Sequence, residues 1–287
     1  MKLNEIHIRD PFVLVDDNKY YLYGSRASEA SDICFGLDVY VSDDLENWSE
    51  PTEVFTRPEN FWSDRNYWAP EVHKYKDEYY MFVSFKSETR NRGVQILKSA
   101  SPMGPFLIHS DGPVTPAEWS CLDGTLYIEK GIPYMIFCHE WTQVRDGEMC
   151  VVELSQDLKE SAGKPFLLFK ASEPSWACGL HNEDKYVTDG PFIYKTENNR
   201  LVMVWSSFAK TGYCEAIAYS DNNSIFGKWT HDDRLLFEKD GGHGMIFKDL
   251  NDRLKFVCHR PNKHPAERPC FFELYEKDDT LYLKDID

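Results

Sequence analysis

The chain has 287 residues, is 42% hydrophobic and 15% aromatic, and carries a formal net charge of -16 at neutral pH. A chain of this length can bury a large core, and its acidic balance excludes nucleic acid and anionic membranes as favoured partners because both would repel it. The N-terminal residues lack the apolar core of a signal peptide, and no uncharged apolar run approaches the roughly 20 residues of a membrane span. The eight cysteines form no CxxC pair. We therefore expect a reduced, cytoplasmic protein whose substrate is uncharged or cationic.

The first predicted element is a hairpin over residues 10–23, in which the polar cluster at 16–18 forms the turn. A third strand is predicted over 39–42, and an outer loop follows over 43–48. The same order of parts recurs four more times, and the later units begin near residues 69, 123, 189 and 242. Successive units start roughly 55 to 65 residues apart, which is typical of propeller blades and not of helical solenoids.

Very little of the chain has helical periodicity with caps, so the pattern favours an all-β fold. Each unit supplies about four strands, and four-stranded sheets repeated around a channel form a β-propeller. Five units therefore predict a five-bladed β-propeller that is one domain over residues 1–287. The longest insertions, 55–66 and 167–184, are rich in aromatic and charged residues and are predicted to form binding walls.

Acidic residues stand near the start of four of the five predicted inner strands. These residues are Asp10, Glu71, Asp123 and Asp189. The inner strands of a propeller start beside the central channel, so their side chains should converge there. Asp-Gly and Asp-Pro pairs can also simply mark turns, but a cluster of carboxylates is costly unless it is protonated, hydrogen-bonded or metal-bound. Glycoside hydrolysis uses such a set: a protonated acid for the leaving oxygen and a carboxylate that activates water, roughly 6.5 to 9.5 Å apart in inverting enzymes.

Five short motifs stand at these strand starts. They are Arg9-Asp10-Pro11-Phe12, Trp68-Ala69-Pro70-Glu71, Leu122-Asp123-Gly124-Thr125, Thr188-Asp189-Gly190-Pro191 and Gly242-His243-Gly244. In this order they resemble glycoside hydrolase family 43, whose members are five-bladed propellers and mainly inverting β-xylosidases, α-L-arabinofuranosidases and arabinanases. The resemblance spans nearly the whole chain. It implies that Asp10 is the general base and that Asp123 orients and tunes the proton donor.

The proton donor is the position at which this chain departs from the resemblance. Family members usually carry Glu before Gly-Pro, whereas this chain carries Asp189. A carboxyl group that is one methylene shorter lies about 1.5 Å further back, and a donor must be within hydrogen-bond reach of its oxygen. Either Asp189 is the donor and the blade compensates, or the donor is another residue. Glu140 is the second candidate and Glu215 the third, although Glu140 also fits an ordinary solvent-facing strand end.

Further residues are candidates for binding, and Glu71 of the acidic set is a candidate for substrate binding. His243 matches a channel histidine that in relatives helps to hold a water or a calcium ion, and a buried histidine bonded to the backbone is the alternative. The chemistry is expected to need no cofactor, and a structural calcium in the channel stays open. Arg268 could hydrogen-bond sugar hydroxyls or form a surface ion pair. Four tryptophans lie near the motifs and are predicted sugar-stacking walls, about two of them contacting substrate and the rest packing in the core: Trp62, Trp68, Trp119 and Trp141.

The leading hypothesis is an inverting, exo-acting glycosidase that releases arabinose or xylose from short oligosaccharides or glycosides. A sugar-binding propeller that has lost turnover is the alternative from another class, and the aspartate at the donor position motivates it. A glycosidase of another specificity, such as a galactosidase, also stays open. A phosphorylase or transferase on the same architecture would need a basic phosphate pocket, which the acidic composition disfavours. The sequence makes no prediction of the oligomeric state.

Overall fold

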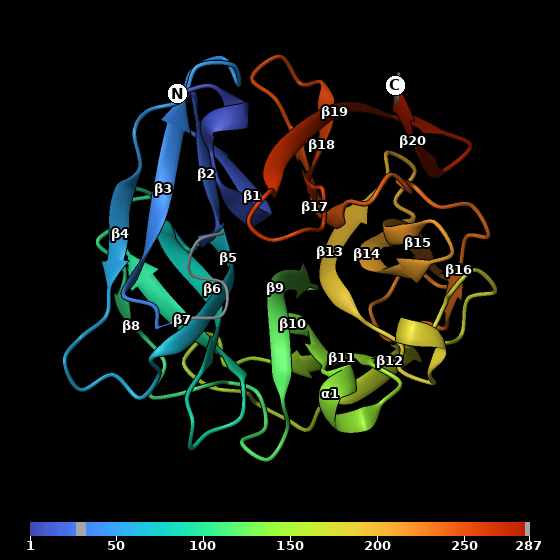
Figure 1. Cartoon of the computed structure of the whole chain (residues 1–287), viewed down its shortest axis with the longest axis horizontal. Helices are drawn as coiled ribbons and strands as arrows, with labels where there is room; N and C mark the ends of the chain where they lie inside the picture. The colour runs from blue at the N-terminus through green and yellow to red at the C-terminus, as the bar shows by residue number, and fades with distance from the viewer. Residues whose placement is uncertain (27–32, 285–287) are drawn as a thin grey trace.

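The computed structural model describes residues 1–26 and 33–284, which form five four-stranded sheets arranged around a central axis (Figure 1). The prediction of an all-β, five-bladed β-propeller is therefore confirmed. Helical segments in the described residues are short. They are η1 (Leu3–Glu5), α1 (Trp141–Val144) and η3 (Leu180–Asn182). None of the described helices is long and apolar enough to cross a membrane.

Each blade is an antiparallel sheet of four strands that are consecutive in the chain. The first blade contains β1 (Ile8–Asp16), β2 (Lys19–Arg26), β3 (Gly36–Ser42) and β4 (Thr52–Thr56). The second contains β5 (Arg65–Tyr75), β6 (Glu78–Lys86), β7 (Gly93–Ser99) and β8 (Leu107–Ile108). The third contains β9 (Cys121–Glu129), β10 (Ile132–His139), β11 (Glu148–Glu153) and β12 (Phe166–Lys170). The fourth contains β13 (Asp189–Lys195), β14 (Leu201–Ala209), β15 (Gly212–Ser220) and β16 (Trp229–His231). The fifth contains β17 (Gly242–Lys248), β18 (Leu254–Arg260), β19 (Arg268–Lys277) and β20 (Thr280–Lys284).

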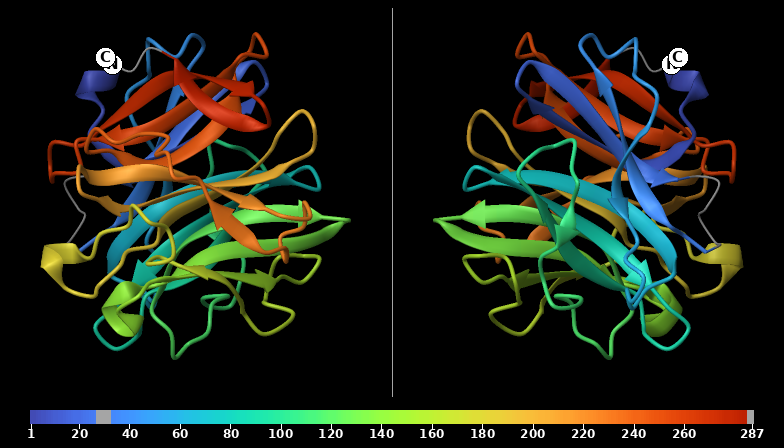
Figure 2. Two further views of the ribbon diagram at one scale, coloured as in Figure 1. Left: turned by 90° about the vertical axis from the view of Figure 1, so that its right-hand side faces the viewer. Right: turned by 90° about the vertical axis from the view of Figure 1, so that its left-hand side faces the viewer.

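The inner strands β1, β5, β9, β13 and β17 contact one another in a ring, and β17 returns to β1. The side views show the twist of the blades (Figure 2). Among the described residues no strand is shared between the first and fifth blades, so side chains close the ring at this seam. Arg9 Nη1 lies 3.1 Å from Glu267 Oε1, and the Trp48 ring stacks on Phe271 with 6.0 Å between centroids.

A β-bulge near the start of each inner strand interrupts its pairing with the second strand. In every blade one residue at the bulge has a φ between 46° and 57°. These bulge residues are Asp10, Ala69, Asp123, Gly190 and His243. A bulge bends the strand and re-aims its side chains, here toward the axis. Gly190 has a second reason to be glycine, because a Cβ there would lie 2.7 Å from the His243 ring.

The backbone N–H of each bulge residue is held by the preceding blade. In four cases the acceptor is a side chain on the second strand of the preceding blade. The residue that carries it pairs with the residue immediately before the bulge of that preceding blade. The pairs are Ala69 N with Ser25 Oγ (2.7 Å), Asp123 N with Ser84 Oγ (2.9 Å), His243 N with Ser206 Oγ (2.6 Å) and Asp10 N with His259 Nδ1 (3.2 Å). In the third blade this position is Cys138, and Gly190 N donates instead to Asp123 Oδ2 at 3.0 Å.

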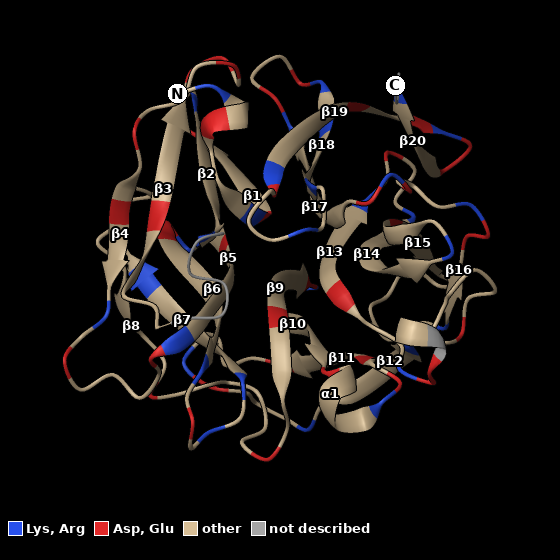
Figure 3. Ribbon diagram, in the orientation of Figure 1, with Lys and Arg blue, Asp and Glu red and all other residues tan. Residues whose placement is uncertain are grey.

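Further along the inner strands, aromatic rings fill the channel. The Phe12 ring lies 5.1 Å from His73 and 6.3 Å from Phe192, and the three residues come from β1, β5 and β13. These rings lie further along the strands than the bulges, whose own polar side chains face the axis at one end of the propeller. Acidic and basic residues are interspersed along the loops and outer strands (Figure 3). The described residues include all eight cysteines and form no disulfide, and six of the cysteines are buried.

Candidate active site

A cavity of about 120 Å³ lies on the axis at the bulges. Its lining comes from all five blades and consists of Arg9, Asp10, Trp68, Leu122, Asp123, Asp189 and His243. Each of these residues is a bulge residue or the residue immediately before one, so the five bulges build the cavity. A water molecule takes up about 30 Å³ in the liquid, so this volume corresponds to roughly four waters. It is comparable to the size of one small sugar ring.

Asp10 is 8% exposed and is arranged as an ionised carboxylate. Ser25 Oγ donates to its Oδ2 at 2.6 Å, and His243 Nδ1 lies 3.3 Å from its Oδ1. Burial by itself raises the pKa of the Asp10 carboxyl, but His243, Arg9 and the other polar neighbours outweigh burial and lower it to about 2. An ionised carboxylate facing a cavity can accept a proton from water.

His259 supports Asp10 from the second strand of the fifth blade. Burial lowers the pKa of its imidazole to about 3, so the ring is neutral near pH 7. Its Nδ1 then accepts the Asp10 backbone N–H, and its Nε2 faces Asn262 Oδ1 at 3.3 Å. We therefore interpret His259 as a neutral hydrogen-bond acceptor and not as an ion-pair partner of the Asp10 carboxylate. The Tyr213 ring stacks on His259 with 5.6 Å between centroids.

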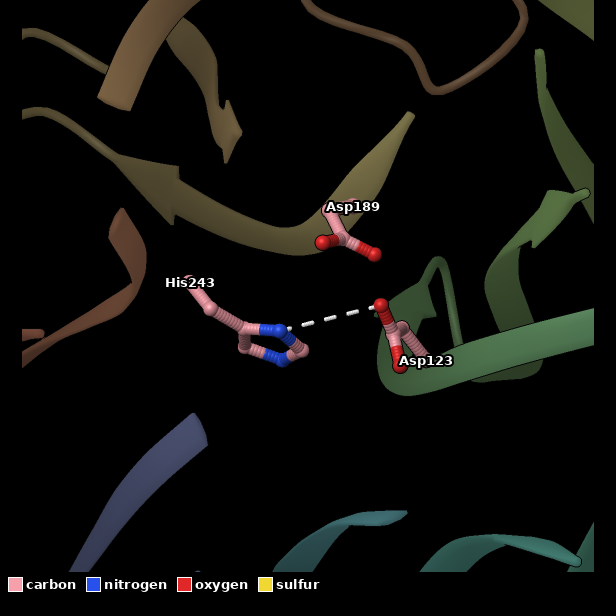
Figure 4. Close-up of side chains that lie close together, drawn as sticks. All are labelled: Asp123, Asp189 and His243. Atoms are coloured by element: carbon pink, nitrogen blue, oxygen red, sulfur yellow. Dashed lines mark ion pairs between the residues drawn. The ribbon is translucent and has the colours of Figure 1, made fainter. Parts of the chain in front are cut away.

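Asp123 and Asp189 form a carboxyl pair opposite His243 (Figure 4). Burial raises the pKa of Asp123 to about 7. Burial first, and then the charge of Asp123, raise the pKa of Asp189 well above its usual range. The hydrogen bond between the two carboxyls favours an ionised Asp123 and a protonated Asp189. Such a pair holds one proton between its members, and here Asp189 carries it.

Hydrogen bonds fix both members of this pair. Gly190 N donates to Asp123 Oδ2 at 3.0 Å, and the Tyr213 hydroxyl donates to Asp189 Oδ2 at 2.8 Å. Tyr213 is 1% exposed, so its ring is part of the packed wall behind the cavity. The cavity thus contains an ionised carboxylate, Asp10, and a protonated carboxyl group, Asp189.

His243 lies between the two acidic positions. Its Nδ1 is 3.3 Å from Asp10 Oδ1 and 3.7 Å from Asp123 Oδ2. His243, Asp123 and Asp189 each offer one ligand atom, and these atoms lie within 4.8 Å of one another. Calcium takes six to eight oxygen ligands at about 2.3–2.6 Å. The three side chains could contribute to a cation site, but water would have to supply most of the ligands to calcium.

Glu140 is placed outside the cavity lining. Its Oε1 lies 2.6 Å from Arg92 Nη1, and its Oε2 accepts a hydrogen bond from Ser120 Oγ at 2.7 Å. The Arg92 guanidinium in turn lies 4.0 Å from the centroid of the Trp68 ring, which lines the cavity. Glu140 is therefore the counter-ion of an arginine one layer behind the wall. This geometry favours Asp189 over Glu140 as the proton donor.

Glu71 and Arg268 also lie outside the lining. The bulge of the second blade is at Ala69, so Glu71 lies two residues further along β5, where its Oε2 is 3.0 Å from His73 Nε2. The register thus matches Ala69, and not Glu71, to Asp10. Arg268 Nε donates to the Asn4 carbonyl at 2.8 Å, which places this guanidinium at the seam between the first and fifth blades.

Of the four tryptophans singled out from the sequence, Trp68 lines the cavity. Trp62 Nε1 donates to Gln95 Oε1 at 2.6 Å, and Trp141 is the first residue of α1. The ring of Trp119 stacks on His139, with 4.2 Å between centroids and 4° between the ring planes. These three side chains are not part of the cavity lining.

Two residues at the site had no role in the sequence analysis. Arg9 lines the cavity and is held by Glu267 Oε1 (3.1 Å) and Asn262 Oδ1 (3.2 Å). The sequence signal for Arg9 is its position immediately before the bulge residue Asp10. Asp189 has the matching position immediately before the bulge residue Gly190. Tyr213 lies two residues before Glu215 on β15, and Glu215 pairs with Ser206 on β14. Only the register of these two strands would have indicated that the Tyr213 side chain points toward the site.

An ionised carboxylate and a protonated carboxyl group at one cavity are the pair that glycoside hydrolases use for general acid and base catalysis. Residues 4–278 match the model of glycosyl hydrolases family 43, and the chain belongs to this family. It is a glycosidase of the inverting type.

Solved structures and a curated relative agree with this assignment. An endo-arabinase from Bacteroides thetaiotaomicron is 40% identical with a TM-score of 0.90, covering 97% of this chain and 98% of that one. A thermostable family-43 glycoside hydrolase is 26% identical with a TM-score of 0.85, covering 97% of this chain and 93% of that one. The extracellular endo-α-(1→5)-L-arabinanase 1 of Bacillus subtilis is 26% identical over 153 residues, which are 50% of this chain and 46% of that protein. This last match thus spans less than half the length of the curated relative.

Proposed function

We propose that the protein hydrolyses α-L-arabinofuranosyl linkages in α-1,5-linked arabino-oligosaccharides, with inversion at the anomeric carbon. The observation that carries the proposal is the pairing of an ionised Asp10 with a protonated Asp189 at one cavity. The choice of arabinose is supported by the names of the relatives that are 40% and 26% identical. Xylose, which the sequence analysis also included, is the competing sugar.

In the proposed reaction one sugar ring occupies the cavity. Asp189 donates its proton to the glycosidic oxygen as the bond to the anomeric carbon breaks. A water molecule attacks that carbon from the opposite face, and Asp10 takes the proton that this water loses. Asp123 keeps the pKa of Asp189 high and orients it, and Tyr213 holds Asp189 Oδ2. Exchange with solvent then restores the starting protonation of Asp10 and Asp189, and no cofactor enters a step.

The experiment compares hydrolysis of α-1,5-arabinotriose, 4-nitrophenyl α-L-arabinofuranoside, 4-nitrophenyl β-D-xyloside and 4-nitrophenyl β-D-galactoside by the wild type and Asp10→Asn. We expect a preference for the arabinosides, a β-configured first product by proton NMR, and a loss of about 10²–10⁴-fold in Asp10→Asn. A preference for the xyloside or galactoside would refute the choice of sugar. A wild type that is inert on every substrate but binds arabinotriose in calorimetry would replace hydrolysis by the sugar-binding alternative.

We further propose that cleavage releases the terminal residue, as the cavity volume for one ring supports. The relatives named as endo-acting support internal cleavage as the second mode. The time course on α-1,5-arabinohexaose distinguishes the modes. Terminal release gives arabinose and the pentamer as the first products, whereas internal cleavage gives dimers, trimers and tetramers from the start.

A further inference from the structure

Glu215 is a fully buried carboxyl group on β15 that the proposed reaction does not use. Its Oε2 accepts hydrogen bonds from Ser206 Oγ at 2.6 Å and from the Gly244 backbone N–H at 3.0 Å. Ser206 Oγ in turn accepts the His243 backbone N–H at 2.6 Å. Glu215 therefore holds two successive N–H groups of β17, one directly and one through Ser206.

The fifth blade has a particular need for this acceptor. In three of the other blades the residue after the bulge residue is a proline, which has no N–H to satisfy. In the fifth blade the residue is Gly244, where a Cβ would lie 2.3 Å from the Phe256 ring, so a larger residue does not fit. The Gly244 N–H is buried and needs an acceptor. Glu215 provides it.

The bulge held in this way carries His243, whose Nδ1 lies 3.3 Å from Asp10 Oδ1 and 3.7 Å from Asp123 Oδ2. Figure 4 shows the imidazole facing Asp123. His243 has a φ of 51°, a left-handed conformation that a residue with a side chain keeps only where its surroundings impose it. The hydrogen bonds of the His243 N–H to Ser206 and of the Gly244 N–H to Glu215 fix the peptide groups on both sides of the His243 Cα, and so impose this conformation. A shift of this bulge would move the imidazole away from the Asp10 carboxylate.

The protonation of Glu215 agrees with an uncharged group that accepts hydrogen bonds through Oε2. Burial raises the pKa of its carboxyl to about 8, so it is neutral near pH 7. Its Oε2 carries both accepted hydrogen bonds, and its Oε1 has no hydrogen-bond partner among the described residues. An amide can therefore replace the carboxyl and retain the acceptor oxygen. Glu215 does not line the cavity, which separates it from the donor role considered from the sequence.

We propose that Glu215 is a positioning residue: through Ser206 and Gly244 it fixes the bulge of β17 and so holds the His243 imidazole between the base Asp10 and the tuning acid Asp123. It acts on turnover without contact with the substrate. The part of the test that measures hydrolysis rests on the proposed function.

The first test compares Glu215→Leu, which removes the acceptor at similar volume, with Glu215→Gln, which keeps it. We expect kcat/KM on arabinotriose to fall by roughly tenfold or more in Glu215→Leu and to stay within about threefold in Glu215→Gln. Met149→Ala is the matched control, because Met149 has the position in the third blade that Glu215 has in the fourth. Met149 pairs with Cys138, and Glu215 pairs with Ser206. It should destabilise the fold and leave kcat/KM within about threefold.

A double-mutant cycle with His243→Ala separates positioning from general destabilisation. If Glu215 acts through His243, Glu215→Leu will change kcat/KM by less than about twofold in the His243→Ala background. An equal loss in both backgrounds, or an unchanged rate in folded Glu215→Leu, would overturn the proposal. Ser206→Ala removes the intermediate hydroxyl and should match Glu215→Leu, so it carries the test if Glu215→Leu does not fold.

The imidazole resonances of ¹⁵N-histidine-labelled protein provide a readout that needs no turnover. The His243 signal, assigned by its loss in His243→Ala, should shift in Glu215→Leu and Ser206→Ala and stay in place in Glu215→Gln. An unshifted signal in Glu215→Leu and Ser206→Ala contradicts the positioning role. If the wild type hydrolyses no glycoside, the proposed function fails, and the resonances still decide the role of Glu215.

Discussion

Replacement of Asp189 by asparagine tests whether this residue is the proton donor. The amide oxygen of the introduced asparagine can still accept the Tyr213 hydroxyl, which is now 2.8 Å from Asp189 Oδ2. Its amide nitrogen can donate to Asp123, the neighbour with which Asp189 now shares a proton. The substitution therefore keeps the geometry and the neutral charge of a protonated Asp189 and removes only the transferable proton.

The expected loss depends on the leaving group. General acid catalysis contributes about 10²–10⁴-fold, which corresponds to roughly 2.7–5.5 kcal/mol of transition-state stabilisation. Arabinotriose needs this proton because its leaving group is a sugar alkoxide, so kcat should fall by that factor. 4-Nitrophenyl α-L-arabinofuranoside leaves as a stabilised phenolate, and its rate should fall by less than about tenfold.

The assay measures kcat and KM on both substrates for the wild type, Asp189→Asn and the control Glu140→Gln. Glu140→Gln breaks the buried ion pair with Arg92, so it should lower the melting temperature and leave the ratio of the two rates unchanged. Equal losses on both substrates in Asp189→Asn, or no loss, would refute the donor assignment. A selective loss on arabinotriose in Glu140→Gln would transfer the role to Glu140.

Three further predictions concern the pH profile, the bulge and the seam. Burial and the charge of Asp123 raise the pKa of Asp189, so Asp123→Asn should lower this pKa. The alkaline limb of the kcat/KM profile should then move to lower pH, and a limb that does not move in a pH series contradicts the pairing of the two carboxyls. Gly190→Ala places a Cβ 2.7 Å from the His243 ring at a φ of +49° and should cost about 1–3 kcal/mol in denaturant unfolding, and an unchanged midpoint would show that the bulge adapts. Arg268→Ala should lower stability by about 1 kcal/mol without a change in kcat/KM, whereas lost activity at full stability would place Arg268 at the substrate.

The sequence predicted the propeller because each inner strand opens with a short motif and the five motifs have an even spacing. It also brought Asp10, Asp123, Asp189 and His243 to one cavity, since strand starts must meet at the axis. Glu71 was matched to these positions by its charge. A match by proline, which follows both Asp10 and Ala69, would have found the register.

Other parts of the site depend on geometry that the strand starts do not contain. Tyr213 and Glu215 reach the site across three paired strands, so their directions follow from the register of β13, β14 and β15. The sequence around Glu140 and Arg268 resembles that of the site motifs, yet both side chains bind residues of a distant segment. Glu140 forms an ion pair with Arg92, and Arg268 donates a hydrogen bond to the Asn4 carbonyl. Which charged residue finds such a partner is decided by tertiary packing, and the local pattern gives no signal of it.

The seam gives the proposed base an unusual dependence on the two ends of the described chain. Asp10 belongs to the first blade, and its backbone N–H is held by His259 of the fifth. Parting of these two blades would detach Asp10 from its support while the hydrogen-bonded ladders inside every sheet stay intact. Loss of activity on heating therefore reports the opening of the ring of blades at this seam. It should precede the loss of β-sheet signal in circular dichroism.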